Sequence, residues 1–197
     1  MASSSTRNIL LTGVGGQGIV TASQALAEAC VRSGFQVKKS EIHGMSQRGG
    51  SVESHVRFCT DGEVYSPTIP EGEADALISF ELLEALRGLP FTRPTAQVIA
   101  DERRIVPMSV TAGKATYPAD PEGLLRASGR KVHIVRAFEI AANLGEPRAA
   151  NIVLLGVATH FLPIAPETWA EAIRAVVRPK AVEINIQALE AGRALVA

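Results

Sequence analysis

NILLTGVGGQG, residues 8–18, decides the fold of this chain. Its first five residues form a short apolar run, as in a buried strand. Three glycines follow at the spacing G-x-G-x-x-G. Apolar residues then recur at helical spacing from Ile19 as far as Gly34, a residue type that commonly ends helices. The stretch therefore predicts a strand, a tight glycine turn and a helix, in that order.

The segments that follow predict the kind of sheet. A second strand at residues 35–40 would complete a β-α-β unit with a right-handed crossover. Residues 51–58 alternate apolar and polar side chains, which predicts a half-exposed strand. Asp61-Gly62 is a turn signal, so residues 63–66 are expected to return as the antiparallel partner of that strand. Together these segments predict a mainly parallel sheet with an antiparallel hairpin element.

The rest of the chain continues the α/β pattern and ends in a helical C-terminal third. Further strands are expected at residues 74–80, 96–100 and 132–135. Helices are expected at residues 81–87, 138–144, 149–161, 166–177 and 181–191. Residues 103–130 show no strong period, and we assign them mostly to loop with a weak strand and helix. With no repeat and no long linker, the sequence predicts one Rossmann-like α/β domain at residues 7–197, after a disordered tail at residues 1–6.

Composition narrows the class of protein. The chain has 197 residues, of which 46% are hydrophobic and 20% charged, as in a soluble globular protein. The 20 Lys and Arg residues balance 20 Asp and Glu residues, which argues against a nucleic-acid partner. No apolar run approaches the roughly 18–20 residues that span a bilayer, and no signal peptide is evident, so we expect a cytoplasmic protein without a membrane partner. The near-zero net charge removes one barrier to association with a partner, and homodimer formation by the isolated chain stays open.

The chain has only two cysteines, Cys30 and Cys59, and no CxxC motif. A cubane iron–sulfur cluster normally takes four thiolates, so this chain cannot hold one alone. Both cysteines lie among apolar residues and are expected to be small core residues in a reducing compartment.

The glycine turn has the chemistry of a phosphate site. Gly13 allows the tight turn, Gly15 lets backbone N–H groups approach a phosphate, and Gly18 permits close packing of helix on strand. The dipole of the following helix favours negative charge at this place. A nicotinamide or flavin dinucleotide is therefore the first candidate ligand.

Two details count against a dinucleotide. Gly16 and Gln17 place an amide side chain where small or apolar residues are usual. A dinucleotide site also needs an acidic residue at the end of the second strand to hydrogen-bond the ribose. Here that residue would be Glu41, which lies within a polar segment instead. Three interpretations of the turn stay open: it lies near a phosphate or cofactor, it forms a separate dinucleotide site, or it binds nothing.

The polar segment, residues 41–57 (EIHGMSQRGGSVESHVR), is the second candidate binding surface. Its glycines leave the backbone free to display Ser46, Gln47 and Arg48. Arg48 can make bidentate contacts with a carboxylate or phosphate, and the other two offer neutral donors. For Arg48, an ion pair at a subunit contact competes with ligand binding.

The sequence shows no arrangement of residues that is typical of a catalytic site. Ser46 lacks a G-x-S-x-G frame, and paired carboxylates for acid–base work are absent. His43 and His55 have no evident third metal ligand, which favours hydrogen-bonded structural roles for both. We therefore predict no catalytic residue and no metal ligand, and the chain does not look like a complete enzyme.

The two candidate segments together carry a family resemblance. GVGGQG at residues 13–18, SEIHGMSQRGGSVESHVRF at 40–58 and YSPTIPEGEADALISFELLEAL at 65–86 resemble the gamma subunit or domain of 2-oxoacid:ferredoxin oxidoreductases. PRAANIVLLG at 147–156 and the late Asn185 resemble it too. The likeness covers about residues 7–190 and is nearest to the small (beta) subunit of the indolepyruvate branch.

The resemblance implies a role as one subunit of a complex. Such complexes decarboxylate a 2-oxoacid on thiamine diphosphate, pass electrons through [4Fe-4S] clusters to ferredoxin, and release an acyl-CoA. In the indolepyruvate branch a large partner subunit carries the thiamine diphosphate and the clusters, so this chain would hold no cofactor alone and would be inactive alone. Gly13–Gly18 and Ser46–Arg48 would face the partner's active site or the channel for coenzyme A. An arylpyruvate is the expected substrate, with pyruvate or a branched 2-oxoacid as open alternatives.

Two other functions remain. The glycine turn alone would suit an independent NAD(P)- or flavin-binding oxidoreductase. The polar segment would equally suit a purely structural interaction subunit with no ligand nearby.

Overall fold

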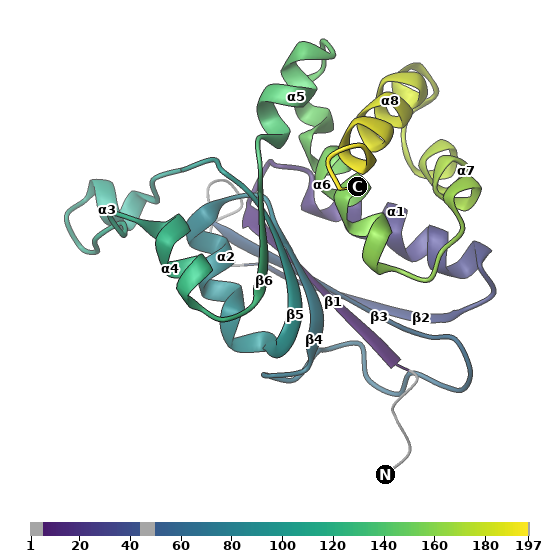
Figure 1. Ribbon diagram of the computed structural model, residues 1–197, viewed down its shortest axis with the longest axis horizontal. Coiled ribbons are helices and arrows are strands. Elements are labelled where there is room, and N and C mark those ends of the chain that lie inside the picture. The colour runs from purple at the N-terminus through teal and green to yellow at the C-terminus, as the bar shows by residue number, and fades with distance from the viewer. Residues whose placement is uncertain (1–5, 44–49, 197) are drawn as a thin grey trace.

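The first apolar strand lies in the middle of the sheet, and most of its side chains are buried. The computed structural model describes residues 6–43 and 50–196. Within these ranges one six-stranded sheet has the order β2-β3-β1-β4-β5-β6 (Figure 1). Its strands are β1 (Thr6–Val14), β2 (Gln36–His43), β3 (Ser51–Cys59), β4 (Ala74–Ser79), β5 (Thr92–Asp101) and β6 (Lys131–Val135). Of the predicted tail at residues 1–6, all but Thr6 falls outside the described residues.

Four neighbouring strands, β1, β4, β5 and β6, pair in parallel. β3 is antiparallel both to β1 and to β2. The predicted α/β class and the antiparallel element in a mainly parallel sheet are therefore confirmed. β2 runs parallel to β1 but is not its neighbour, because β3 is inserted between them and splits the predicted β-α-β unit.

The prediction that residues 63–66 pair with β3 as a hairpin was wrong. β3 turns back on β2 instead, with Gln36 opposite Cys59 and His43 opposite Val52. Because β1 and β2 occupy both edges of β3, residues 63–66 have no edge to join. The N–H of Val64 donates to the side-chain oxygen of Gln36 rather than to a strand.

β3 is also less exposed than its alternation predicted. His55, expected on the exposed face, is only 1% exposed because the ring of Phe91 packs edge-on against it, with 5.7 Å between the centroids. The Nδ1 atom of His55 accepts a hydrogen bond of 3.0 Å from the N–H of Ile69. The predicted structural role of this histidine is confirmed.

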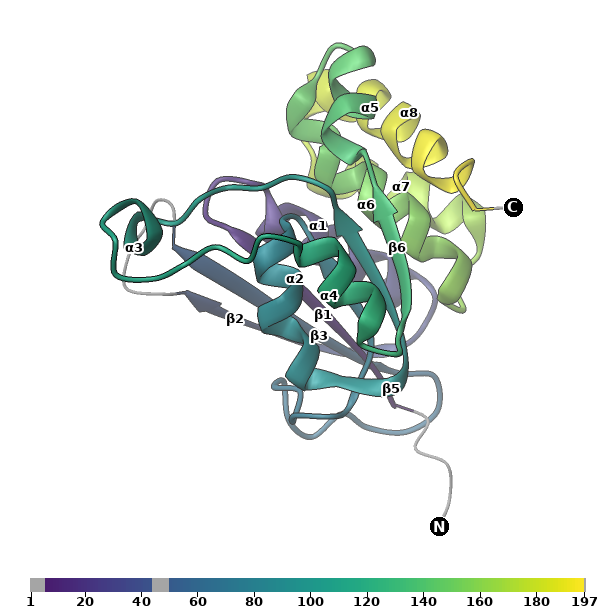
Figure 2. The ribbon, with the colours of Figure 1, turned by 60° about the vertical axis from the view of Figure 1, so that its left-hand side comes forward.

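Helices cover both faces of the sheet (Figures 1 and 2). One face carries α1 (Ile19–Arg32), α5 (Ala137–Asn143), α6 (Ala150–Ala158), α7 (Pro166–Val176) and α8 (Val182–Arg193). The other carries α2 (Leu82–Gly88) and α4 (Pro121–Ala127), and α3 (Met108–Thr111) projects at the end of a long loop. Single turns of 3-10 helix lie at Leu89–Phe91, Pro147–Ala149, Thr159–Phe161 and Pro179–Ala181. The predicted helices are confirmed, whereas the weak strand expected within residues 103–130 does not form.

The C-terminal helices pack at very short range. A Cβ atom added at Gly192 would lie 2.0 Å from the carbonyl oxygen of Val153, and one at Gly156 would lie 2.2 Å from that of Leu189. α6 and α8 can therefore cross in this way only with glycine at both positions. All nine residues of α6 are buried between its neighbours and the sheet.

Both cysteines lie in the core, as predicted, and neither forms a disulfide bond. Burial raises the pKa of the Cys30 thiol to about 12, which keeps it protonated and inert. No helix within residues 6–43 and 50–196 has the length and hydropathy of a membrane span.

Candidate functional site

A groove of about 940 Å³ opens beyond the carboxyl ends of β1 and β5. Its walls are the glycine turn, the start of the β5–α4 connection, and the loops that precede α6 and α8. α1 leaves β1 on one face of the sheet, and α2 leaves β4 on the other (Figure 1). Open α/β sheets commonly bind ligands at such a switch point.

Two residues of the glycine turn have a backbone conformation that favours glycine. Gly16 and Gly18 have φ angles of 103° and 81°, in the left-handed region. A Cβ atom on Gly18 would lie 2.6 Å from Nδ2 of Asn151, which donates to the carbonyl oxygen of Gly18 at 3.0 Å. In the described ranges no side chain caps the first turn of α1 and no acidic residue lies in it. Open N–H groups at a helix start favour an anion.

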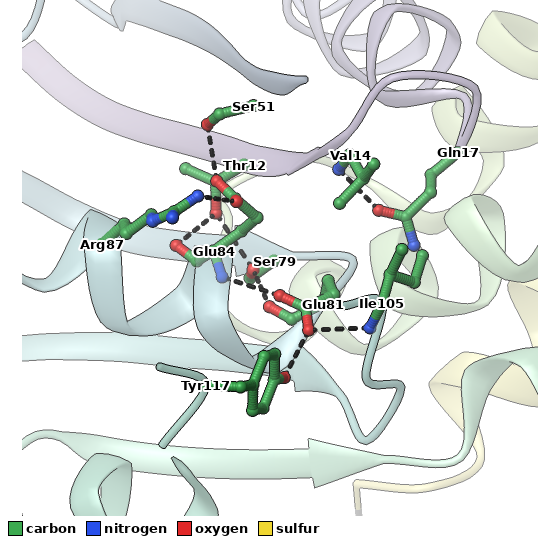
Figure 3. A network of polar contacts seen from close by, with 10 residues as sticks. All are labelled: Thr12, Val14, Gln17, Ser51, Ser79, Glu81, Glu84, Arg87, Ile105 and Tyr117. Atoms are coloured by element: carbon green, nitrogen blue, oxygen red, sulfur yellow. Dashed lines mark hydrogen bonds and ion pairs between the residues drawn. The ribbon is translucent and has the colours of Figure 1, made fainter. Parts of the chain in front are cut away.

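Two of the predicted site residues are engaged within the protein itself. The N–H of Gly15, expected to face a phosphate, donates to the carbonyl oxygen of Gly50 at 2.9 Å. The amide of Gln17 accepts from the N–H of Val14 at 2.7 Å (Figure 3). It also donates to the carbonyl oxygen of Phe80 at 2.5 Å. Gln17 therefore holds the turn in shape, and its side chain is not free for a ligand.

Ser46, Gln47 and Arg48 fall outside the described residues, so their place in the site stays a prediction. What the structure does bring together is the middle of the polar segment and the glycine turn, through the bond between Gly15 and Gly50.

Glu41 does not lie where a dinucleotide ribose would need it. It belongs to β2, which β3 separates from β1. A hydrogen bond from Lys39, 2.6 Å long, lowers the pKa of the Glu41 carboxyl, and His43 lies 3.5 Å from its other oxygen. This acid is therefore part of an ion-paired edge strand, which counts against the dinucleotide interpretation.

Four cations line the groove, and sequence reasoning missed all of them. Arg148, Arg178 and Lys180 are exposed, and none of them forms an ion pair with a described residue. The fourth, Arg103, holds its guanidinium carbon 4.3 Å from the ring centroid of Phe138. These side chains come from three distant segments, so no local motif could have revealed them.

Two buried acceptors also lie at the groove. Asp101 ends β5, is 1% exposed, and has one carboxylate oxygen without a hydrogen-bond partner among the described atoms. Burial raises the pKa of Asp101 to about 6, against the opposing charge of Arg103. Asn151, 5% exposed, likewise leaves its Oδ1 without a partner in the part of the chain described. The groove thus combines a cationic rim with unsatisfied acceptors at its floor.

A family model described as pyruvate ferredoxin/flavodoxin oxidoreductase matches residues 8–195. The chain belongs to this family. The predicted family resemblance is confirmed. The motifs that carried it include the glycine turn at the groove and the segment 147–156, which contains Asn151.

Curated members of the oxidoreductase family are similar over nearly the whole chain. The indolepyruvate oxidoreductase subunit IorB of Archaeoglobus fulgidus is 45% identical, over 94% of this chain and 92% of that protein. The subunit of the same name from Thermococcus kodakarensis is 41% identical, over 94% and 93%.

Solved structures of the family have the same fold. The gamma subunit of a keto/oxoacid ferredoxin oxidoreductase from Geobacter sulfurreducens superposes with a TM-score of 0.70 at 23% identity, over 97% of this chain and 99% of that one. A 2-oxoglutarate:ferredoxin oxidoreductase from Magnetococcus marinus, with 2-oxoglutarate, coenzyme A and succinyl-CoA bound, gives a TM-score of 0.76 at 19% identity. That match covers 98% of this chain but only 31% of the longer one.

The residues of this chain do not fit a resident iron–sulfur cluster. It has two cysteines, buried in α1 and β3, where a cubane cluster takes four. Among the residues that the structure describes, no group of three or more His, Cys, Asp or Glu side chains could hold a metal ion.

Proposed function

We propose that this chain is the small subunit of a thiamine diphosphate-dependent 2-oxoacid:ferredoxin oxidoreductase of the indolepyruvate type. The observation that carries the proposal is 45% identity to an indolepyruvate oxidoreductase subunit over 94% of the chain. The complex would decarboxylate an arylpyruvate oxidatively to an acyl-CoA and deliver the electrons to ferredoxin.

The catalytic cofactors would belong to a large partner subunit. Two buried cysteines cannot supply a [4Fe-4S] cluster, so electron transfer to ferredoxin would run through the partner. We assign thiamine diphosphate to the partner as well, and the complex to the cytoplasm. Cys30 and Cys59 form no disulfide bond, which agrees with a reducing compartment.

The groove would hold the phosphate portion of coenzyme A. That molecule carries phosphate groups, and the groove offers the open N-terminus of α1 together with Arg148, Arg178 and Lys180. The backbone of the glycine turn would approach the phosphates, while Ser46, Gln47 and Arg48 are assigned to the same side of the site. Their neighbour Gly50 already bonds to the turn, which supports that assignment.

The test is reconstitution. The chain, the large subunit and the mixture are assayed for indolepyruvate-dependent reduction of a viologen dye in the presence of coenzyme A. We expect activity only when the two subunits are combined. Full activity of the large subunit alone, or of this chain alone, would contradict the proposal.

The glycine motif leaves one other candidate, an independent NAD(P)- or flavin-binding oxidoreductase. The position of Glu41 on β2, two strands from the glycine turn, counts against it. Titration of the isolated chain with NAD(H), NADP(H) and FAD separates the two. Micromolar binding of a dinucleotide would favour this candidate, and its absence the subunit role.

A further inference from the structure

Glu81 is a buried carboxylate between the end of β4 and the start of α2, next to Phe80, which lines the groove. It follows Phe80, whose carbonyl oxygen binds Gln17 of the glycine turn, and it is 1% exposed. Its Oε2 accepts from the N–H of Glu84 at 2.9 Å and so caps the start of α2. A helix cap needs only one acceptor of this kind.

The second oxygen of Glu81 binds a distant part of the chain. Oε1 accepts from the N–H of Ile105 at 3.0 Å and from the hydroxyl of Tyr117 at 2.5 Å, residues 24 and 36 positions further on (Figure 3). Burial and the neighbouring carboxylate raise the pKa of Tyr117, so its hydroxyl remains a donor at physiological pH. Both bonds go to residues 102–117, the connecting segment after β5.

A further bond beside these contacts holds Arg103 in place. The N–H of Leu82 donates to the carbonyl oxygen of Arg103 at 3.1 Å, two residues before the bond between Ile105 and Glu81. The backbone is thus held at the carbonyl of Arg103 and at the N–H of Ile105, and the side chain of Arg103 lines the groove over Phe138. Apart from the four residues of α3, the connecting segment has no regular structure, so these anchors determine its course.

We propose that Glu81 and Tyr117 are a positioning pair: they hold the connecting segment, and with it Arg103, across the groove from the glycine turn and thereby set the affinity for coenzyme A. This inference rests on the proposed function of the groove. Neither side chain lines the groove, so the pair acts through Arg103 rather than on the ligand.

The test is Tyr117→Phe in the reconstituted complex, with Tyr65→Phe as the matched control. These are the only two tyrosines of the chain, and Tyr65 is 84% exposed. For Tyr117→Phe we expect the KM for coenzyme A to rise about tenfold, with kcat and the KM for the 2-oxoacid within about twofold, since about 1.4 kcal/mol of lost affinity is a factor of ten. The control should match the wild type. Glu81→Gln, which has one carbonyl oxygen for three donors, should raise the KM at least as much.

A purely structural role would give a different pattern. Loss of folded complex lowers the apparent kcat without moving the KM for coenzyme A, and that result would overturn the inference. Hydrogen exchange of the complex without coenzyme A should increase in residues 102–117 of Tyr117→Phe and stay unchanged in α8. Unchanged exchange in the connecting segment would also overturn it.

The failure of this inference is distinguishable from failure of the groove assignment. If Arg148→Ala and Lys180→Ala raise the KM for coenzyme A while Tyr117→Phe does not, the positioning pair is wrong and the groove site stands. If none of the three variants moves that KM, both are wrong.

Discussion

The side-chain Nε2 of Gln17 donates a hydrogen bond of 2.5 Å to the carbonyl oxygen of Phe80 and so joins the glycine turn to the end of β4. The Oε1 atom of the same amide accepts from the N–H of Val14. These bonds determine where the first turn of α1 lies relative to the groove. The Gln17 amide, which is unusual for a dinucleotide-binding turn, therefore holds the backbone of the glycine turn in position at the groove.

We expect Gln17→Ala to lower the free energy of unfolding by about 1–3 kcal/mol, because it leaves the N–H of Val14 and the carbonyl of Phe80 without their partner. Urea unfolding of the purified chain measures the change. Gln187→Ala removes only an exposed contact to Glu183 and should cost less than about 0.5 kcal/mol. Equal effects of the two substitutions would show that Gln17 does not hold the turn.

The crossing of α6 and α8 should tolerate no side chain at its closest point. Gly192→Ala would put a Cβ atom 2.0 Å from the carbonyl oxygen of Val153, so the helices must separate. We expect a loss of about 1–3 kcal/mol, as for other overpacked cores, and a lower Tm. Glu190→Ala, on the exposed side of α8, is the control. A Gly192→Ala protein as stable as the control would mean that the helices are not held at this distance.

The features of the fold that could be predicted are those determined by neighbouring residues in the sequence. Residues 8–12 and 74–80 formed strands as predicted because a continuous apolar run indicates burial. The partner of β3 was predicted wrongly because the sequence of a strand does not show whether it pairs with the preceding or the following segment. The alternation in residues 51–58 shows which side chains share a face, but not that β1 and β2 occupy both edges.

The site divides in the same way. The turn between β1 and α1 was predictable because consecutive residues form it, and Gly16 and Gly18 have the left-handed φ angles that explain their residue type. The contribution of Asp101, Arg103 and Lys180 was not predictable, because none of them belongs to a recognisable motif in its own segment. They become a site only when the ends of β5 and α7 are brought to the start of α1.

The exposed cations of the groove should affect coenzyme A more than the 2-oxoacid. For Arg148→Ala and for Lys180→Ala we expect the KM for coenzyme A to rise about threefold to tenfold, with less effect at high salt because exposed charges are screened. Steady-state assays of the reconstituted complex at low and high ionic strength measure this. Arg126→Ala, whose guanidinium pairs with Glu122 on α4, is the charge-matched control. An equal rise in the control would mean that net charge, not the groove, is responsible.

Asp101 should make the stability of the chain depend on pH in a definite direction. Burial raises the pKa of its carboxyl from 3.8 to about 6, so the folded state holds a proton that the unfolded state releases. This contribution is fully present below about pH 4 and is lost as the pH rises through 6, by at most roughly 3 kcal/mol. Asp101→Asn cannot titrate and should gain stability relative to the wild type between pH 4 and pH 7.

Urea unfolding at several pH values measures the difference between the two proteins, in which all other titrating groups cancel. Glu190→Gln, an exposed carboxylate beside Arg193, should show a flat difference over the same range. A flat difference for Asp101→Asn as well would mean that the carboxylate is solvated or paired in solution. Asp101 would then not be an unsatisfied acceptor at the floor of the groove.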